Sequence, residues 1–235
     1  MKTSIFFLCI LYFLSINSCL YGQSYTQQLQ KDIDAIISKK MKQYDIPGLS
    51  IGVVSQGAIA YTKGYGIRSI DTKNPVTENT VFHTASISKL FTAMAIIDLE
   101  QKGCLHLDNT LLNIAPELKS EDMRIHTITI RQLLNHTSSL GDITNYHWST
   151  HNQSDDSLKK YLLSLHLKSK QSPSTTYSYS NLGYNLLGYI IEKVTNQPFE
   201  GYMQNEILNT IGMSNSDYRY FNIPDNLRTS PHTKN

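Results

Sequence analysis

The sequence predicts an α/β part followed by an all-α part, a fold of the class α/β plus all-α. Two neighbouring segments between residues 49 and 65 have the composition of β-strands and are separated by a Gln-Gly turn. Apolar residues recur at helical spacing before and after this hairpin, and no convincing strand follows it. The chain is therefore expected to begin with a helix and a hairpin and to continue as a set of helices.

The composition is that of a folded protein without a strong charge bias. Its 235 residues include 21 Lys and Arg against 19 Asp and Glu, a formal charge of +2, and 40% of them are hydrophobic. These values disfavour a disordered or fibrous chain. The basic residues are scattered, whereas phosphate binding needs a clustered basic face, so nucleic acid is not expected as a partner.

Residues 1–22 have the order of a secretory signal peptide. A charged start, Met1-Lys2, precedes a short apolar run and then small or turn-forming residues up to Gly22. The run is too short to span a bilayer, and no later segment has 18 consecutive apolar residues, so no membrane span is expected. An alternative is that Cys19 becomes a lipid anchor, because Ile16 to Cys19 resembles a loose lipoprotein box. Both alternatives predict export, to the periplasm or the exterior, and the second predicts a membrane-anchored lipoprotein.

Residues 23–78 are interpreted as the N-terminal helix and β-hairpin of an incomplete α/β domain. Apolar residues at helical spacing predict a helix from Gln27 to Tyr44, which the Pro47-Gly48 pair ends. The hairpin is expected as a strand, a turn and a second strand over Leu49–Ser55, Gln56-Gly57 and Ala58–Tyr65. An isolated two-stranded ribbon is marginal in water, so the hairpin is expected to need further strands.

Residues 79–217 are interpreted as a helical domain that carries the active-site motifs. A helix is expected from about Ser86, and Gly103 is placed to end it. Further helices are expected at Thr129–Asn135, at 158–165, at 182–194 and from Pro198, as first helical residue, to Ile207. Residues 218–235 are interpreted as a truncated tail. Its last part, Ile223 to Asn235, is polar, so the chain is expected to be cut short at its C-terminus.

The segment Ser86-Ile-Ser-Lys89 fits the pattern Ser-x-x-Lys. Residues three apart share one face of a helix, so the amine of Lys89 is expected near the hydroxyl of Ser86. Free N–H groups and the helix dipole at the helix start favour developing negative charge there. A hydroxyl becomes a good nucleophile when a nearby base takes its proton, and a partly desolvated lysine can be that base.

The motif is weak when it stands alone, because short patterns occur by chance. Ser157-Leu-Lys-Lys160 is a second Ser-x-x-Lys, and we interpret it as a solvated helix face. Tyr179-Ser-Asn181 fits Tyr-x-Asn, and Tyr220-Phe-Asn222 is a second example in the tail. The sequence around each match therefore has to show which of the two Ser-x-x-Lys and which of the two Tyr-x-Asn segments belongs to a functional site.

Three blocks in this order resemble the serine beta-lactamase-related family, which includes class C beta-lactamases, D-alanyl-D-alanine carboxypeptidases and other penicillin-binding protein-like serine hydrolases. The blocks are the Ser86 motif after Thr80–Ala85, the segment Arg131–Ser138, and the segment Tyr177–Tyr184. The resemblance runs from about Ile33 to about Asp217. It implies a beta-lactamase/transpeptidase-like fold, with the C-terminal strands and final helix of the sheet missing from this chain.

The resemblance also implies an activity and a set of roles. Ser86 would attack a carbonyl and form an acyl-enzyme, while Lys89 and Tyr179 share the transfer of its proton and Asn181 holds the substrate amide. The substrate would be a beta-lactam, a D-Ala-D-Ala or other peptidoglycan-derived peptide, or a simple ester. No cofactor and no metal ion are implied, and the oligomeric state is left open.

Two departures from the family pattern stand out. Ser139 replaces the glycine of the usual His-Thr-Ser-Gly-Leu block, which is expected to strain the backbone of a tight loop. The third family motif, Lys or His followed by any residue and Gly on a late strand, is absent. That strand supplies the second oxyanion donor in the family. The alternative function is therefore an incomplete or inactive member that binds or is acylated by such ligands without turnover.

Two further groups carry weaker hypotheses. His147 and His151 have helix-compatible metal spacing, but no glutamate base lies between them and their surroundings are loop-like, so metal binding is not favoured. Cys104 is the single cysteine after the signal peptide, so no internal disulfide is expected. We expect it to be a buried thiol beside a surface histidine, His106, rather than half of a reactive pair.

Overall fold

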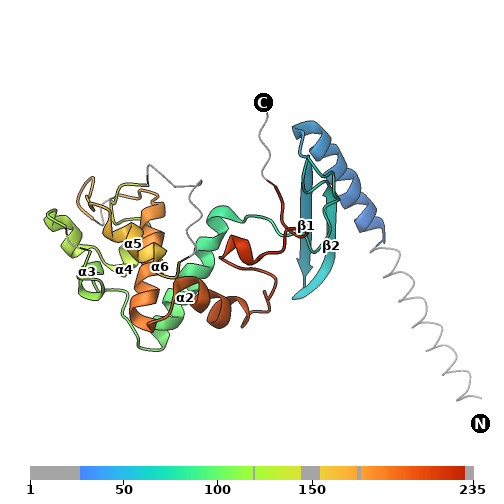
Figure 1. Ribbon diagram of the computed structural model, residues 1–235. Helices are drawn as coiled ribbons and strands as arrows, with labels where there is room; N and C mark the ends of the chain where they lie inside the picture. The colour runs from blue at the N-terminus through green and yellow to red at the C-terminus, as the bar shows by residue number, and fades with distance from the viewer. Residues whose placement is uncertain (1–26, 119, 144–153, 174–175, 231–235) are drawn as a thin grey trace, which may run out of the picture. The chain divides into compact units, whose positions relative to one another are not determined.

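The computed structural model describes residues 27–118, 120–143, 154–173 and 176–230. The chain divides into two compact units, residues up to Phe82 together with those from Asn226, and His83–Asp225 (Figure 1). The predicted signal peptide and the alternative lipid anchor at Cys19 lie outside the described residues. No helix in the described part of the chain is both long enough and apolar enough to cross a membrane.

The first unit consists of a helix over residues 27–44 and an antiparallel hairpin beside it (Figure 1). Strand β1 runs from Gly48 to Ser55 and strand β2 from Ala58 to Gly66, with Gly48 opposite Gly66. The turn residues Gln56 and Gly57 have φ angles of 50° and 76°. Two consecutive positive φ angles match the right-handed twist of the strands, and the predicted turn is confirmed.

The end of the described chain also belongs to this unit. The backbone of Val81 donates to the carbonyl of Leu227 at 2.9 Å and accepts from the amide of Thr229 at 3.2 Å. This pairing is an isolated parallel bridge and not a third strand of the sheet. Among the described residues the sheet therefore has two strands.

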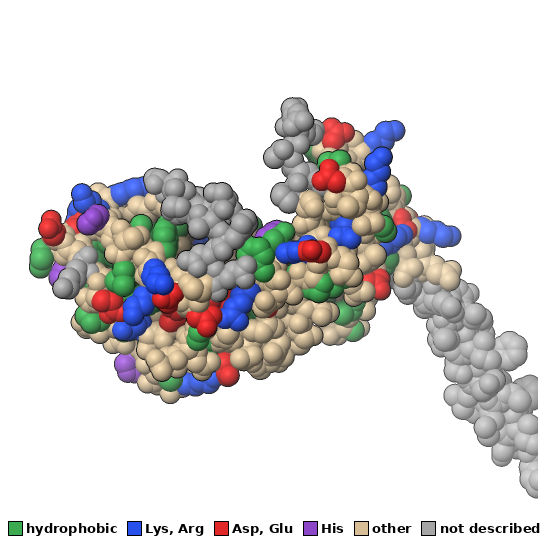
Figure 2. Space-filling view, in the orientation of Figure 1, with side chains coloured by type: hydrophobic (Ala, Val, Ile, Leu, Met, Phe, Trp, Pro, Cys, Tyr) green, Lys and Arg blue, Asp and Glu red, His purple; other side chains and the backbone are tan. Residues whose placement is uncertain are grey.

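The second unit contains every other described helix. Its elements are the 3-10 turn η1 (Ala85–Ile87), α2 (Ser88–Gln101), α3 (Leu111–Ile114), the 3-10 turn η2 (Met123–Thr127), α4 (Ile130–Leu134), α5 (Ser157–Leu163), α6 (Asn181–Thr195), α7 (Phe199–Tyr202), the π-helical segment η3 (Met203–Leu208) and the 3-10 turn η4 (Tyr220–Asn222). Charged side chains of both signs are interspersed on the face shown in Figure 2.

Helix α6 lies at the centre of the second unit's core. Ser180 caps its start, where the hydroxyl accepts from the amide of Gly183 at 3.1 Å, and Asn196 ends it in a left-handed conformation. Its apolar stripe includes Leu186 and Ile190, both fully buried. Helices α2, α4 and α5 contact α6, and α2 lies beside it in Figure 1. This packing fixes the starts of α2 and α6 relative to each other.

Two local expectations need correction. Pro198 caps α7, which begins at Phe199, and the predicted fifth helix continues as a π-helical segment from Met203. Cys104 is exposed rather than buried. Gly103 takes a φ of 71° to end α2, and this turn directs the following Leu105 into the core instead, leaving 3% of its surface exposed.

Candidate active site

The hydroxyl of Ser86 is presented on a strained turn at the start of α2. Ser86 lies in η1, directly before α2, and its side chain is exposed. The preceding Ala85 has a φ of 47°, a left-handed conformation that costs an alanine about 1–2 kcal/mol. The hydroxyl of Ser88 donates to the carbonyl of Ala85 at 2.6 Å and holds this turn. Such strain is often found where a side chain has to be aimed at a ligand.

Ser86 has two polar partners from different elements. Its Oγ lies 2.7 Å from the phenolic oxygen of Tyr179, in the segment before α6. The ammonium of Lys89, one turn along the helix, donates to the same Oγ at 3.2 Å. A nucleophile, an amine and a phenol therefore meet within hydrogen-bonding reach, although the serine and the tyrosine are 93 positions apart.

Lys89 also joins Ser86 to the start of α6. Its Nζ donates to the Oδ1 of Asn181, the first residue of α6, at 2.7 Å. The same ammonium lies over the rings of Tyr179 and Tyr184, at 5.1 and 5.7 Å from their centroids. Such cation–π contacts attract the ammonium to the faces of these rings. The structure thus brings together all four predicted site residues.

The electrostatic surroundings make Tyr179 more acidic than a free tyrosine. The Lys89 ammonium, first, and the Ser86 hydroxyl hold the pKa of the Tyr179 phenol below its usual range, while partial burial opposes them. The Tyr179 side chain remains 41% exposed. A lowered pKa raises the fraction of Tyr179 that is ionised near neutral pH, and the phenolate is the form that can take a proton from a neighbouring hydroxyl.

Asp142 fixes the orientation of Asn181, and the sequence analysis did not single it out. The backbone amide of Asn181 donates to Asp142 Oδ1 at 2.9 Å, and its side-chain Nδ2 donates to Oδ2 at 3.1 Å. With the amide nitrogen turned to Asp142, the Asn181 Oδ1 faces Lys89. Burial alone would raise the pKa of Asp142, but N–H groups of Ile143 and Asn181 hold it below its usual range.

His136 is the second functional-site residue that sequence analysis left without a role. It follows α4, and its ring packs against those of Tyr179 and Tyr184, with centroids 4.5 and 5.2 Å apart. The backbone amide of Ser180 donates to its Nδ1 at 3.2 Å. The one sequence signal for it was its place in the His-Thr-Ser block; the contact spans 44 positions.

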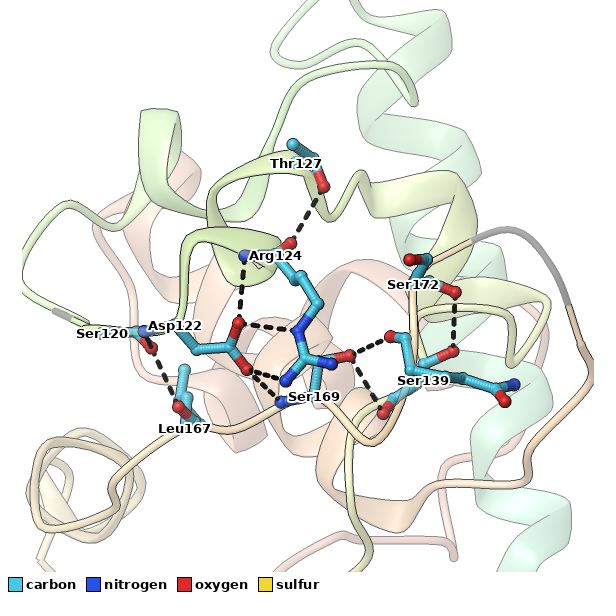
Figure 3. A network of polar contacts seen from close by, with 9 residues as sticks. Ser120, Asp122, Arg124, Thr127, Ser139, Leu167, Ser169 and Ser172 are labelled. Atoms are coloured by element: carbon cyan, nitrogen blue, oxygen red, sulfur yellow. Dashed lines mark hydrogen bonds and ion pairs between the residues drawn. The ribbon is translucent and has the colours of Figure 1, made fainter.

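The loop between His136 and Asp142 is strained and firmly anchored. Ser139 is 1% exposed and has a φ of 58°, which confirms the expected backbone strain where the family has glycine. Its carbonyl accepts from the amide of Lys170 at 2.9 Å. Figure 3 shows the continuation of this network, in which Asp122 accepts from the amide of Ser169 at 2.9 Å and from Arg124 at 2.8 Å.

The other motif matches lie elsewhere. Lys160 pairs with Asp156 at 2.8 Å and is 67% exposed, in keeping with a solvated helix face. Tyr220 stacks on His83, with ring centroids 4.9 Å apart and an angle of 19° between the planes. His147 and His151 lie outside the described residues.

A model of the Beta-lactamase family matches residues 33–233. The chain belongs to this family. Among curated proteins it is 34% identical over 201 residues to the Protein flp of Staphylococcus aureus strain COL, covering 84% of this chain and 40% of that protein. It is 29% identical over 212 residues to a Beta-lactamase of Providencia stuartii, covering 90% of this chain and 52% of that protein.

Several solved structures have the same fold as this chain. The octameric penicillin-binding protein homologue from Pyrococcus abyssi matches with a TM-score of 0.72 at 27% identity, covering 85% of this chain and 47% of that one. A class C beta lactamase matches with a TM-score of 0.71 at 27% identity, covering 87% and 55%. The D-alanine carboxypeptidase AmpC from Burkholderia cenocepacia matches with a TM-score of 0.67 at 28% identity, covering 89% and 58%.

These comparisons confirm the beta-lactamase/transpeptidase-like fold that the three sequence blocks implied. The chain spans about half the length of the relatives that it matches, from 40% of the Protein flp to 58% of the carboxypeptidase. The described residues accordingly combine a helical unit with a small sheet of two strands.

Proposed function

We propose that this protein is a serine hydrolase that acts through an acyl-enzyme on Ser86. The observation that carries the proposal is the convergence on Ser86 Oγ of the Tyr179 phenol at 2.7 Å and the Lys89 ammonium at 3.2 Å. A serine hydroxyl held against two groups that can exchange protons is the arrangement that nucleophilic catalysis requires. Membership of the Beta-lactamase family supports the same reaction class.

The proposed reaction has two halves. Ser86 Oγ attacks the substrate carbonyl as its proton passes to the Tyr179–Lys89 pair, in which Tyr179 is present as the phenolate beside the Lys89 ammonium, and a tetrahedral oxyanion forms. When the oxyanion collapses, the carbonyl–leaving-group bond breaks, the pair returns the proton to the leaving group, and the acyl group stays on Ser86. Water then attacks the ester carbonyl and gives a proton to the same pair. The bond between the acyl carbon and Ser86 Oγ breaks, the acid is released, and the pair returns that proton to Oγ. Tyr179 suits the first step because its pKa is lowered by Lys89 and Ser86.

Binding of the substrate falls to two further groups. We assign the backbone N–H of Ser86 as an oxyanion donor, since it lies in the helical turn that opens α2. We assign Asn181 to the substrate amide, because Asp142 and Lys89 hold its side chain in one orientation beside the nucleophile.

The substrate class that we propose is a beta-lactam, a D-Ala-D-Ala peptide or an ester. The matched class C beta lactamase and D-alanine carboxypeptidase bear names that fit the first two. We further propose that the protein is exported, because residues 1–22 have the pattern of a signal peptide. Lipidation at Cys19 is the form of export that would anchor it to a membrane.

A second candidate function is capture without turnover. The sequence contains no His or Lys followed two residues later by Gly, the pattern that borders the active site in the family. Loss of one oxyanion donor typically lowers the rate by about a hundred- to a thousandfold. A chain with an intact Ser86 group but one donor fewer would be acylated slowly and would release the acyl group more slowly still.

Intact-mass spectrometry of the full chain with a penicillin tests both candidates. We expect one added penicillin mass on the wild type and none on Ser86→Ala. A Lys89→Met variant should be labelled at a rate lower by about a hundredfold or more, because general acid–base groups contribute that much. Loss of the adduct within minutes would indicate a hydrolase, and persistence over hours would indicate a binder. An equal adduct on Ser86→Ala, or no acylation by penicillins, D-Ala-D-Ala esters and simple activated esters alike, would contradict the proposal.

A further inference from the structure

His136 contacts the segment around Tyr179 with both its backbone and its ring. It has a φ of 60°, in the left-handed region that histidine adopts more readily than most residues. Its carbonyl oxygen accepts from the backbone amide of Ser178 at 2.8 Å. Its ring Nδ1 accepts from the backbone amide of Ser180 at 3.2 Å.

These two hydrogen bonds lie on either side of Tyr179. One ends on the residue before it and the other on the residue after it, so together they hold the backbone that carries the phenol. The His136 ring also packs on the Tyr179 ring at 4.5 Å, with 33° between the planes. The position of the Tyr179 oxygen beside Ser86 therefore depends on a residue that touches neither Ser86 nor, in the proposed reaction, the substrate.

The hydrogen bond from Ser180 defines the state of the ring. A backbone amide can only donate, so Nδ1 has to present its lone pair. The ring is then neutral, with its proton on Nε2. Protonation of Nδ1 would replace this hydrogen bond by two donors facing each other and would release one side of the Tyr179 segment.

The groups around the ring favour the neutral form. The titratable or charged neighbours are Lys89 on α2, Asp142 on the loop, Tyr177 and Tyr179 in the segment before α6, and Tyr184 on α6. Burial lowers the pKa of His136, the Lys89 ammonium lowers it further, and the Asp142 carboxylate opposes them. The acceptor at Nδ1 is thus retained through neutral pH and is lost only in acid.

We propose that His136 is a positioning residue for Tyr179, and that its neutral Nδ1, as acceptor for the amide of Ser180, holds the phenol against Ser86. The consequence for the reaction rests on the proposed function, whereas the positioning of Tyr179 does not. A change at His136 should therefore alter the acidity of Tyr179 as well as the rate of acylation.

His136→Asn and His136→Leu form a matched pair for testing this. The two side chains have nearly the same shape, but the Oδ1 of asparagine can take the place of Nδ1 as acceptor, and leucine offers none. Asparagine tolerates the left-handed backbone and leucine does not, so His136→Gly, which tolerates it and lacks an acceptor, is the control for backbone strain. The pKa of Tyr179 is followed by NMR on protein labelled at tyrosine Cζ, with Tyr179→Phe assigning the signal and circular dichroism checking the fold.

We expect the lowered pKa of Tyr179 to persist in His136→Asn and to rise toward the ordinary value of about 10 in His136→Leu. Penicillin acylation of Ser86 should fall about ten- to a hundredfold in His136→Leu, since small displacements of a reacting group cost that much, and much less in His136→Asn. In the wild type, the rate of Ser86 acylation should also fall as the pH drops through the pKa of His136. This fall should be absent in His136→Asn.

The two readouts separate the positioning role from the activity. If the wild type takes up no penicillin but Tyr179 still shifts in His136→Leu alone, the proposed function fails and the positioning role stands. If acylation is normal and the two variants behave alike in both readouts, the positioning role is overturned. Nitrogen NMR that places the His136 proton on Nδ1 at neutral pH would overturn it as well. If His136→Leu does not fold, two other observations decide whether the positioning role stands. They are the tautomer of His136 in the wild type and the absence, in His136→Asn, of the fall in acylation rate at low pH.

Discussion

The two units of this chain are stabilised in different ways. The hydrophobic core of the helical unit is made of side chains between Ala95 and Ile207, many of them fully buried. In the described part of the helix–hairpin unit, by contrast, Val76 is the one buried apolar residue, and large apolar side chains such as Ile36 and Ile59 are 59% and 75% exposed. The difference shows which unit supports the candidate site: Ser86, Lys89, Tyr179 and Asn181 all belong to the unit that has its own core.

The helix–hairpin unit has polar contacts where the other unit has a core. The Asp34 carboxylate on the first helix accepts from Tyr61 at 2.7 Å, from Tyr65 at 2.6 Å and from Lys63 at 2.8 Å. These contacts set how the helix lies on the hairpin. They are partly exposed, however, and exposed ion pairs add little to stability. The comparison between the units can be tested by substitutions in each.

Truncating one apolar side chain in each unit should give the largest difference. Leu186→Ala, at a fully buried position on α6, should lower the free energy of unfolding by about 2–5 kcal/mol, because it leaves a cavity in the core. Ile59→Ala on β2, where the side chain is 75% exposed, should change it by less than about 0.5 kcal/mol. Urea unfolding followed by circular dichroism measures both, and similar losses would remove the distinction between the units.

The Asp142 carboxylate should matter to stability and site alike. Asp142→Asn keeps the shape but removes the charge that accepts from the start of α6, and should cost about 1 kcal/mol, the usual value of a helix cap. The loss in the acylation rate of Ser86, expressed as a free energy, should exceed the loss in the free energy of unfolding, because Asn181 loses its orientation.

The pH dependence of stability gives a second test of the Asp142 carboxylate. Its pKa is lower in the folded protein, so its contribution is fully present above its ordinary pKa of about 3.9 and is lost as the pH falls below that value. Chemical unfolding of wild type and Asp142→Asn between pH 3 and 6 measures this. Two parallel stability profiles would contradict the role given to the carboxylate.

Ser139 and its neighbour test the strain in the active-site loop. Ser139→Gly relieves the left-handed backbone but gives the unfolded chain more freedom, so the free energy of unfolding should change by less than about 1 kcal/mol. Ser138 is equally buried and has no positive φ, so Ser138→Gly should destabilise by about 0.5–1 kcal/mol. Thermal unfolding of the two variants measures both changes in stability. A larger loss of stability in Ser139→Gly than in Ser138→Gly would refute the strain at Ser139.

Asp34 should have the smallest effect on global unfolding and a local one in the helix–hairpin unit. Hydrogen bonds from Lys63, Tyr65 and Tyr61 lower its pKa to about 2. Its contribution is therefore complete above its ordinary pKa of about 3.9 and fades as the pH falls toward 2. Hydrogen exchange on Asp34→Asn should show faster exchange in the helix over 27–44 and unchanged exchange in α6. Equal changes in both helices would mean that the units are not independent in this respect.

Local patterns were enough to predict the hairpin and most helices, and distant contacts were not. The turn at Gln56 and Gly57 and the end of α2 at Gly103 depend on residues a few positions apart. His136 and Asp142 act on residues 44 and 39 positions away, and no periodicity or motif in a single sequence encodes such pairings. The prediction for Cys104 was wrong because burial was inferred from residue type, whereas the turn after α2 decides which side chain enters the core.

The most direct test of the account is to ask which serine of the full chain reacts with a fluorophosphonate, a probe that phosphonylates an activated serine with loss of fluoride. The chain holds its own control, because Ser157 and Lys160 have the same spacing as Ser86 and Lys89 but Lys160 is paired with Asp156. Peptide mapping should find the label on Ser86, at a rate that falls in Tyr179→Phe, and none on Ser157. Equal labelling of both serines, or none on Ser86, would contradict the claim that Lys89 and Tyr179 activate Ser86.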